Sequence, residues 1–323
     1  MGDELALREA EPADARFFAD VFTAAQPARP MDPPELRYLW EHPPRSRVMR
    51  RWIAMRHGAD IGVGEIERPE STDAALRYTS LRGELLPAYR DRATLLAVMS
   101  VIEARACAER PSILRSAANE DDPLRADVLR AMGYREDRRA RRWELDLVGA
   151  RELIAAMTEE SRSRMRVQGI RILTLDRDGD PEILRKLWRL SEDAVRDVPT
   201  TLPHVEEPFD DFLDWLAFPG MHRDRVWLAR RGDDAVGISV LEYPVERGFV
   251  GTAWTATARS VRGQGVARAL KCETLMQAMA LGVDRVRTGN DGENAPILHI
   301  NATMGYRPIA GRVDYLKDVS AAA

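Results

Sequence analysis

The order of apolar and polar residues along the chain predicts alternating strands and helices. The same order of elements occurs in each half of the chain. A short apolar strand opens each half, at residues 5–8 and again at 171–175, and a polar helical segment follows, at 12–23 and 181–195. A long Pro-rich connection then leads to two strands joined as a hairpin. This alternation predicts an α/β fold.

The second part of each half repeats the same order of elements. A third strand runs through an arginine-bearing turn into a long helix, and a further strand follows at residues 113–116 and 285–288. A short helix then leads to a terminal strand, at residues 142–147 and 313–317. We expect each terminal strand to close the sheet of its own half, which gives each half a central mixed β-sheet flanked by helices.

A repeated tetrapeptide supports an internal duplication. Met132-Gly133-Tyr134-Arg135 recurs 172 residues later as Met304-Gly305-Tyr306-Arg307, and Arg90 and Arg262 are separated by the same distance. Repeats on this scale indicate a duplicated structural unit. The predicted organisation is a first domain at residues 1–148, a connecting helix at 149–170 and a second domain at 171–323.

Composition narrows the function classes. The chain has 323 residues, enough for two domains, and 45% of them are hydrophobic, enough for ordinary cores. The formal net charge of −4 gives no basic excess of the kind that nucleic-acid binding needs. Arginine supplies all but three of the 48 basic residues, the exceptions being Lys186, Lys271 and Lys317. We interpret that bias as codon usage.

The chain shows no sign of a membrane segment or a metal site. No stretch of about 18 apolar residues occurs, and the acidic N-terminus has no signal-peptide layout, so we expect a cytoplasmic protein without membrane contact. The two cysteines and five histidines are scattered without the spacing of metal ligands. We therefore predict neither a metal nor a disulfide.

One loop in the second half has the chemistry of an anion site. A strand-like segment at residues 249–258 leads into Arg262-Gly263-Gln264-Gly265-Val266-Ala267, and a helix then runs to about residue 281. The first turn of a helix presents unpaired N–H groups and a partial positive charge to a ligand. Glycines allow the backbone to approach a diphosphate closely.

That loop looks like the Q/R-x-x-G-x-G/A signature of the GCN5-related N-acetyltransferase (GNAT) superfamily. Asn290, Asn294 and the later Met304-Gly305-Tyr306 resemble the downstream region of the same superfamily. The resemblance covers both halves in topology, as in tandem members such as the distantly similar mycothiol synthase, but the specific motifs occur in the second half alone. It implies two tandem GNAT-like domains.

The resemblance also implies acetyl-CoA as a co-substrate, bound in a V-shaped opening beside the third strand of the second half. Pantetheine would pair with the backbone of Thr255, Ala256 and Thr257. Pyrophosphate would bind Arg262, Gly263, Gln264, Gly265, Val266 and Ala267, while Asn290 and Asn294 would contact the other side of the cofactor. For Asn294, a helix N-cap is an equally good interpretation.

The first half lacks this loop. Its counterpart is Arg90-Asp91-Arg92-Ala93-Thr94-Leu95, in which both glycines are gone and a carboxylate stands where phosphate would bind. Because like charges repel, we expect a degenerate first domain without tight cofactor binding.

Catalytic residues are less evident in the sequence. The superfamily often has a Tyr four residues before the helix-ending glycine, but here that position is Asn301, which cannot deliver a proton and which argues against a close match to mycothiol synthase. Tyr306 and Glu242 are further candidates, Glu242 as a general base. Core packing and a solvated strand end are the competing interpretations. A backbone N–H at Ala256 or Thr257 is the expected oxyanion donor.

The predicted function is therefore direct N-acetylation of the amine of a small, cationic molecule. Residues 197–222 carry six acidic residues, which we interpret either as a rim that attracts this amine or as a solvated helix face. The alternatives are a protein N-acetyltransferase and a non-catalytic acyl-CoA-binding sensor or pseudoenzyme. The predicted assembly is a monomer or a homodimer.

Overall fold

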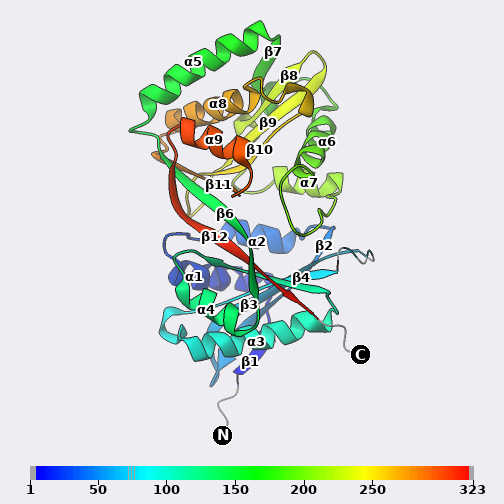
Figure 1. Ribbon diagram of the computed structural model, residues 1–323, viewed down its shortest axis with the longest axis vertical. Helices are drawn as coiled ribbons and strands as arrows, with labels where there is room; N and C mark the ends of the chain where they lie inside the picture. Colours follow the sequence, from blue (N-terminus) through cyan, green and yellow to red (C-terminus); the bar gives the residue numbers. More distant parts are fainter. Residues whose placement is uncertain (1–4, 72, 74, 76, 320–323) are drawn as a thin grey trace.

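The computed structural model describes residues 5–319 except 72, 74 and 76, and it shows two lobes stacked along the long axis of the molecule (Figure 1). The first half contains β1 (Leu5–Glu9), α1 (Ala15–Ala25), α2 (Pro33–Glu41), β2 (Arg47–Arg56), β3 (Ala59–Pro69), β4 (Tyr78–Leu85), α3 (Arg92–Ala108), β5 (Ile113–Asn119), α4 (Pro123–Ala131) and β6 (Arg135–Asp146). The second contains α5 (Arg151–Val167), β7 (Ile170–Thr174), α6 (Ile183–Val195), α7 (Phe209–Leu216), β8 (Val226–Arg231), β9 (Asp234–Glu242), β10 (Gly251–Thr257), α8 (Val266–Ala280), β11 (Arg285–Asp291), α9 (Ala295–Thr303) and β12 (Arg307–Asp318).

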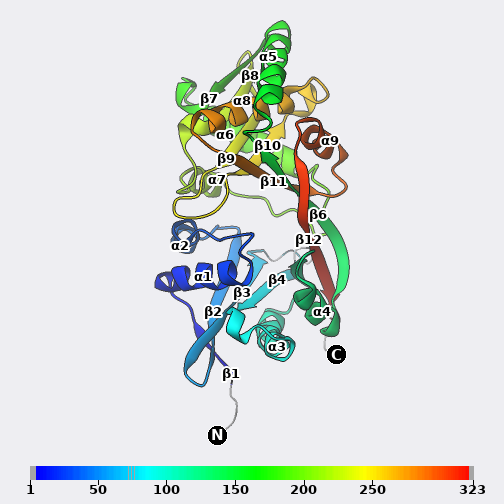
Figure 2. The same cartoon turned by 90° about the vertical axis from the view of Figure 1, so that its left-hand side faces the viewer.

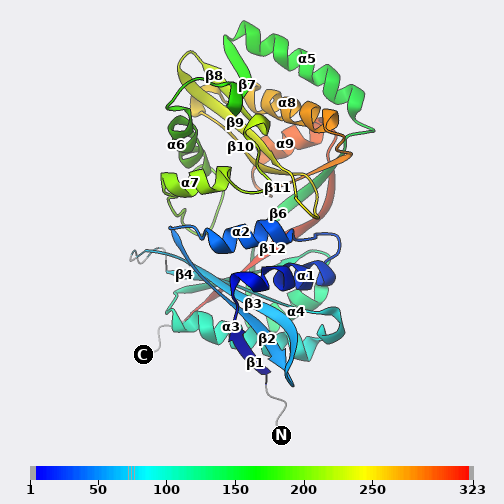
Figure 3. The ribbon, with the colours of Figure 1, turned by 180° about the vertical axis from the view of Figure 1, so that it is seen from behind.

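The two repeated units have the predicted α/β fold, with a mixed sheet flanked by helices. Their strands form one continuous 12-stranded sheet in the order β1-β2-β3-β4-β5-β12-β6-β11-β10-β9-β8-β7. In the second unit, α6 and α7 cover one face of the strands and α8 covers the other, with α5 outside it (Figure 3). The site discussed below lies where these layers meet.

The terminal strands are exchanged between the halves, which corrects one expectation. β6 of the first half pairs with β11 from Arg285 to Asp291, and β12 of the second half pairs with β5 from Arg312 to Asp318. The two long strands also pair with each other and pass between the lobes (Figure 2). The prediction that residues 142–147 and 313–317 close their own halves is therefore wrong. Alternation identifies a strand and its faces, but it does not identify the partner strand.

A helix occupies the segment predicted to connect the halves. α5 packs on α8, and the guanidinium of Arg162 donates to both carboxylate oxygens of Glu273 at 2.7 and 2.8 Å. The domain boundaries at residues 148 and 170 stay a prediction, because strands of both halves belong to one continuous sheet.

The halves also meet through buried charges. The Asp32 carboxylate, just before α2, accepts backbone hydrogen bonds from Val245, Glu246 and Arg247 in the β9–β10 loop. Within the described residues, no helix is long and apolar enough to cross a bilayer, and no group of three His, Cys, Asp or Glu side chains is placed to hold a metal ion.

Candidate functional site

A cleft opens where two parallel strands of the second half diverge. β10 and β11 pair at Gly251 and Arg287 and then separate, and a cleft of about 1030 Å³ lies along the open edge of β10. The residues predicted to contact the cofactor line this cleft with one exception: Thr255, Ala256, Thr257, Arg262, Gly263, Gly265, Val266, Ala267, Asn290 and Asn294 are in its wall.

The N-terminus of α8 forms one end of the cleft and is open to a ligand. Gly265 is the N-cap residue, with φ of +88°, and no side chain caps the helix. Gly263 also has a positive φ, +74°, a conformation that glycine adopts without strain. The unpaired N–H groups of the first turn therefore face the cleft with the positive end of the helix dipole.

Three arginines surround this helix end. Arg262 and Arg268 come from the loop and the first turn of α8, and Arg164 reaches the cleft from α5. A Cβ placed on Gly265 would lie 3.2 Å from the Nη1 atom of Arg164. The positive φ therefore favours glycine at this position, and the Arg164 guanidinium packs close against it.

Gln264 is the exception among the predicted cofactor residues. Its side-chain amide donates to the carbonyl of Ser260 at 3.0 Å and accepts from Arg231 at 2.6 Å. The side chain is directed away from the cleft, so its contribution is to brace the loop.

Asp197 lies beside the loop from Arg262 to Ala267, which is called the phosphate loop below after the ligand predicted for it. Its carboxylate is 2.6 Å from Arg259 and 2.7 Å from Arg262, and these two guanidinium groups lower the pKa of Asp197 to about 2. Arg262 therefore has an anionic partner in place, which a diphosphate would have to displace.

The open edge of β10 carries backbone groups that β9 does not use. The N–H of Ala258 donates to Val236 on β9, and in an antiparallel ladder bonded and non-bonded residues alternate. By this alternation the N–H groups of Thr255 and Thr257 point toward the cleft, whereas that of Ala256 points to β9. Of the two predicted oxyanion donors, Thr257 has the suitable orientation and Ala256 does not.

The strand is also irregular beside these groups. The register of β10 on β9 shifts between Thr252 and Trp254, which leaves Ala253 as a bulged residue. Bulges redirect backbone and side chains and occur often next to functional sites.

Asparagines from two elements line the opposite wall. Asn294 is at the N-cap position of α9, but its side chain makes no capping hydrogen bond and lines the cleft. The Oδ1 atom of Asn290 accepts from the Nδ2 of Asn301 at 2.7 Å. Asn301 is fully buried behind Asn290, so the structure places it as a support for a cleft residue.

Glu242 lies away from the cleft. It ends β9 beside Glu35 of α2, and a Cβ placed on Gly220 would lie 2.6 Å from the Glu35 Oε1 and 2.9 Å from the Glu242 Cγ. Burial, with the neighbouring charge of Glu242, raises the pKa of Glu35 to about 8, and burial also raises the pKa of Glu242. The two carboxyl groups therefore belong to the contact between the halves, and the structure does not bring Glu242 to the cofactor residues.

Tyr306 is buried next to the cleft rather than in its wall. Burial raises the pKa of its hydroxyl, and the centroid of its ring lies 5.1 Å from the Nζ of Lys271. Lys271 itself lines the cleft, as do Arg164 and Arg268. The sequence prediction missed these three, although a lysine in a chain so rich in arginine was a usable signal for Lys271.

Two of the six acids of the 197–222 connection contact the first half. Asp211 and Asp214 receive hydrogen bonds from the Arg45 guanidinium at 3.0 and 2.7 Å, so they join the halves. From this connection Asp197, Val198 and Pro199 line the cleft. Trp254 both packs and lines the cleft, since its Nε1 donates to Ser191 of α6 at 3.2 Å.

The corresponding place in the first half is closed by side chains. Asp91 caps α3 by accepting from the backbone N–H of Thr94 at 2.9 Å. The Arg125 guanidinium donates to the Gly83 carbonyl on β4 and to the Ala117 carbonyl on β5. It therefore bridges the two strands that correspond to β10 and β11.

Comparison with solved structures supports the fold across the whole chain. A tandem GNAT protein from the clavulanic acid biosynthesis pathway has a TM-score of 0.74 and 15% identity, with 99% of this chain and 100% of that chain covered. A GCN5-related N-acetyltransferase from Sphaerobacter thermophilus has a TM-score of 0.65 and 17% identity over 99% and 98% of the two chains.

A third similar structure is a larger fungal protein. It contains a GCN5-related glucosamine N-acetyltransferase region within a multi-domain GH3 β-N-acetylglucosaminidase, and matches with a TM-score of 0.68 and 12% identity over 98% of this chain and 38% of that chain. No family model and no curated protein matches this chain. The chain thus has the tandem GNAT fold, whereas the resemblance to mycothiol synthase in particular is not shown.

Proposed function

We propose that this chain, with its tandem GNAT fold, transfers the acetyl group of acetyl-CoA directly to the amine of a small, cationic molecule. One observation carries the proposal: the open edge of β10 leads to an uncapped helix N-terminus surrounded by Arg164, Arg262 and Arg268. An uncapped helix end beside three guanidinium groups is suited to a diphosphate. The same site is closed in the first half, so the proposal places one acetyl-CoA in the second half.

The residues present fit this co-substrate. The loop from Arg262 to Ala267 would bind the pyrophosphate, and the free N–H groups of Thr255 and Thr257 would pair with the pantetheine. When bound, acetyl-CoA supplies an activated thioester. The chain's own task is to align that thioester with the acceptor amine and to stabilise the oxyanion, for which the N–H of Thr257 is oriented toward the cleft.

The acceptor would enter from the side of α6. Ala194, Val198, Pro199 and Trp254 form an apolar wall there, and Asp197 adds a negative charge at its edge. This combination favours an amine of limited size that approaches as a cation. We also propose that the protein is a monomer or a homodimer.

Calorimetric titration with acetyl-CoA tests the cofactor site. We expect one site in the wild type and at least about a hundredfold weaker binding in Gly265→Glu, because the new side chain meets Arg164 and places a carboxylate at the helix end. Gly232→Glu is the matched control: Gly232 also has a positive φ, +58°, but nothing lies within 4 Å of its added Cβ. No binding by the wild type, or equal loss in both variants, would contradict the proposal.

One observation favours the alternative of a non-catalytic acyl-CoA-binding protein. Asn301 replaces the expected tyrosine and is bonded to Asn290, and Glu242 is not at the cleft. Release of free thiol from acetyl-CoA in the presence of a panel of small amines separates the two functions. An enzyme releases thiol with an acceptor, whereas a sensor binds acetyl-CoA without turnover.

A further inference from the structure

Lys271 is a buried lysine in the wall of the cleft. Only 2% of the Lys271 surface is accessible to solvent, and no described residue accepts a hydrogen bond from its Nζ. Burial lowers its pKa to about 8, which places its proton loss close to neutral pH. Lysines are rarely fully buried unless they are paired, so this one calls for a functional reason.

Tyr306, whose ring faces the Lys271 Nζ, is one of three residues here with buried side-chain oxygens. The side-chain hydroxyls of Thr252 and Tyr306 are buried next to each other, and the buried Oδ1 of Asn301 has no hydrogen-bond partner among the described residues. They come from β10, from the turn before β12 and from α9. Buried polar groups are normally paired, because an unpaired one costs about 1–3 kcal/mol. A cluster of such groups beside a cleft therefore indicates a place where a ligand or its reacting atoms are received.

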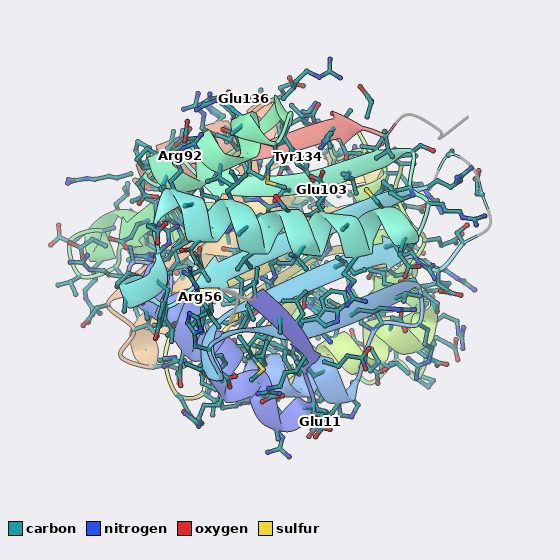
Figure 4. All side chains as sticks on the ribbon, turned by 90° about the horizontal axis from the view of Figure 1, so that it is seen from below. Glu11, Arg56, Arg92, Glu103, Tyr134 and Glu136 are labelled. Carbon is teal, nitrogen blue, oxygen red and sulfur yellow. The ribbon has the colours of Figure 1, made fainter. Side chains whose placement is uncertain are left out.

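The internal repeat shows that the fold does not need this lysine. The residue 172 positions earlier is Met99, which is fully buried in the core of the first half. The repeated tyrosine, Tyr134, also has a lysine near its ring, but that residue is Lys317, whose Nζ lies 2.6 Å from the Glu103 carboxylate. Figure 4 shows Tyr134 and Glu103 side by side over α3.

The position of Lys271 suits the sulfur end of the co-substrate. With pyrophosphate at the N-terminus of α8, directly after β10, the pantetheine runs back along β10 toward Thr252 and the closed end of the cleft. In the first half the Sδ of Met99 lies 3.1 Å from a Cβ placed on Gly83, the counterpart of Thr255. By the internal repeat, the helix position of Lys271 corresponds to one that faces β10 near Thr255, where the thioester would lie if acetyl-CoA binds as proposed.

Resting on the proposed acetyl transfer, we propose that Lys271 is the catalytic residue that protonates the leaving sulfur. The acceptor nitrogen attacks the thioester carbonyl, the C–S bond breaks, and its electron pair stays on sulfur. The Lys271 ammonium gives a proton to that thiolate and becomes a neutral amine. The proton lost by the acceptor nitrogen passes to solvent, from which Lys271 is protonated again.

The residue type suits this role. An arginine cannot give up its proton in a protein, whereas a buried lysine can. A thiol has an ordinary pKa of about 8.5, so a lysine with a lowered pKa is well matched to it. Lys271 thus supplies the proton that Asn301, at the family's usual tyrosine position, cannot.

The titratable groups that face Lys271 are few. Among the described residues, Tyr306 faces its Nζ, and Cys272 adjoins it on α8. The next residue, Glu273, is bonded to Arg162 of α5. No described carboxylate is paired with Lys271, so its ammonium is available to a thiolate.

A thiol titration tests this without knowledge of the acceptor. CoA and desulfo-CoA, which lacks the thiol, are bound to the wild type, to Lys271→Met and to the control Lys186→Met, which removes a lysine paired with Asp180 on the surface. The thiolate is followed by its ultraviolet absorbance. We expect the pKa of CoA bound to the wild type and to Lys186→Met to fall by about one unit, because an adjacent ammonium favours the thiolate.

The outcomes separate the two proposals. In Lys271→Met, the thiol pKa should stay at or above that of free CoA, and the affinity for CoA relative to desulfo-CoA should no longer rise about fivefold as the pH increases to 8.5. An unshifted thiol pKa in the wild type, or the same shift in Lys271→Met, would overturn the role of Lys271. Failure of the wild type to bind desulfo-CoA would instead overturn the proposed function.

Discussion

The two halves arrange the same elements around one corresponding position. That position is open in the second half and filled by side chains in the first. In the second half, Gly265 leaves the N-terminus of α8 uncapped and β10 keeps free backbone groups. In the first, Asp91 caps α3 and Arg125 bonds to carbonyls on both β4 and β5. A buried network of Glu84, Arg90 and Arg125 thus fills the space where a cofactor would lie.

The difference shows that a binding site in this fold consists largely of backbone groups left without protein partners. Leaving them unpaired costs stability, which a ligand restores when it binds. The first half satisfies the same groups internally and becomes a structural unit. The strands agree with this view: β4 pairs with β5 from Tyr78 to Ser80, whereas β10 pairs with β11 at Gly251 alone.

The largest expected effect concerns the closed half. Glu84→Gln should lower the free energy of unfolding by roughly 3–5 kcal/mol, because it leaves the buried guanidinium groups of Arg90 and Arg125 without their shared carboxylate. Urea unfolding measures this change. The exposed Glu70→Gln should alter stability by less than about 0.5 kcal/mol, and acetyl-CoA affinity should be the same in both variants. A stable Glu84→Gln protein would show that the network does not hold the first half together.

The second-largest effect is expected from a substitution that makes the open second half resemble the closed first half. Gly263→Asp introduces the sequence counterpart of Asp91 and would place a carboxylate in the loop before the N-terminus of α8. We expect acetyl-CoA affinity to fall about a hundredfold, because the new carboxylate repels the diphosphate. Calorimetry checks it, with Gly232→Asp as the control for strain at positive φ. Unchanged affinity in Gly263→Asp would refute the comparison between the two loops.

A third prediction concerns the contact between the halves and depends on pH. The pKa of Glu35 in the folded protein, about 8, lies above its unfolded value of about 4.3. The folded state then binds more protons between these values, so the contribution of Glu35 to stability is complete below about pH 4 and is lost as the pH rises toward 8. Glu35→Gln should remove this slope and raise stability at pH 8 by roughly 1–3 kcal/mol relative to the wild type.

Urea unfolding at several pH values between 5 and 8 tests this third prediction. Glu41→Gln, at an exposed residue on the same helix, should keep the wild-type slope. Equal slopes in Glu35→Gln and the wild type would mean that the pKa of Glu35 is not raised in the folded protein.

The smallest effect is expected from a substitution that makes the closed first half more like the open second half. Asp91→Ala removes the cap of α3 and should cost about 1 kcal/mol of stability. It should not create a second acetyl-CoA site, because Arg125 still bridges β4 and β5. A stoichiometry of two in the calorimeter would show that the cap alone, and not the bridging arginine, closes the first half.

The sequence by itself predicted the duplicated α/β fold and an anion site at the start of α8, and the V-shaped opening followed from the family resemblance. The fold and the anion site both depend on local properties: periodicity within each strand and helix, and glycines between a strand and a helix start. The unpaired N–H groups of Val266 and Ala267 exist wherever such a helix begins, so Arg262 to Ala267 could be identified from spacing alone.

The tertiary structure decided what depends on residues far apart in the chain. It exchanged β6 and β12, paired Glu242 with Glu35, brought Arg164 from α5 to the phosphate loop, and buried Lys271 beside Tyr306. Strand partners, burial and the pKa values that follow from burial are set by packing between elements. No local pattern records that packing, and the catalytic assignments therefore rest on the structure.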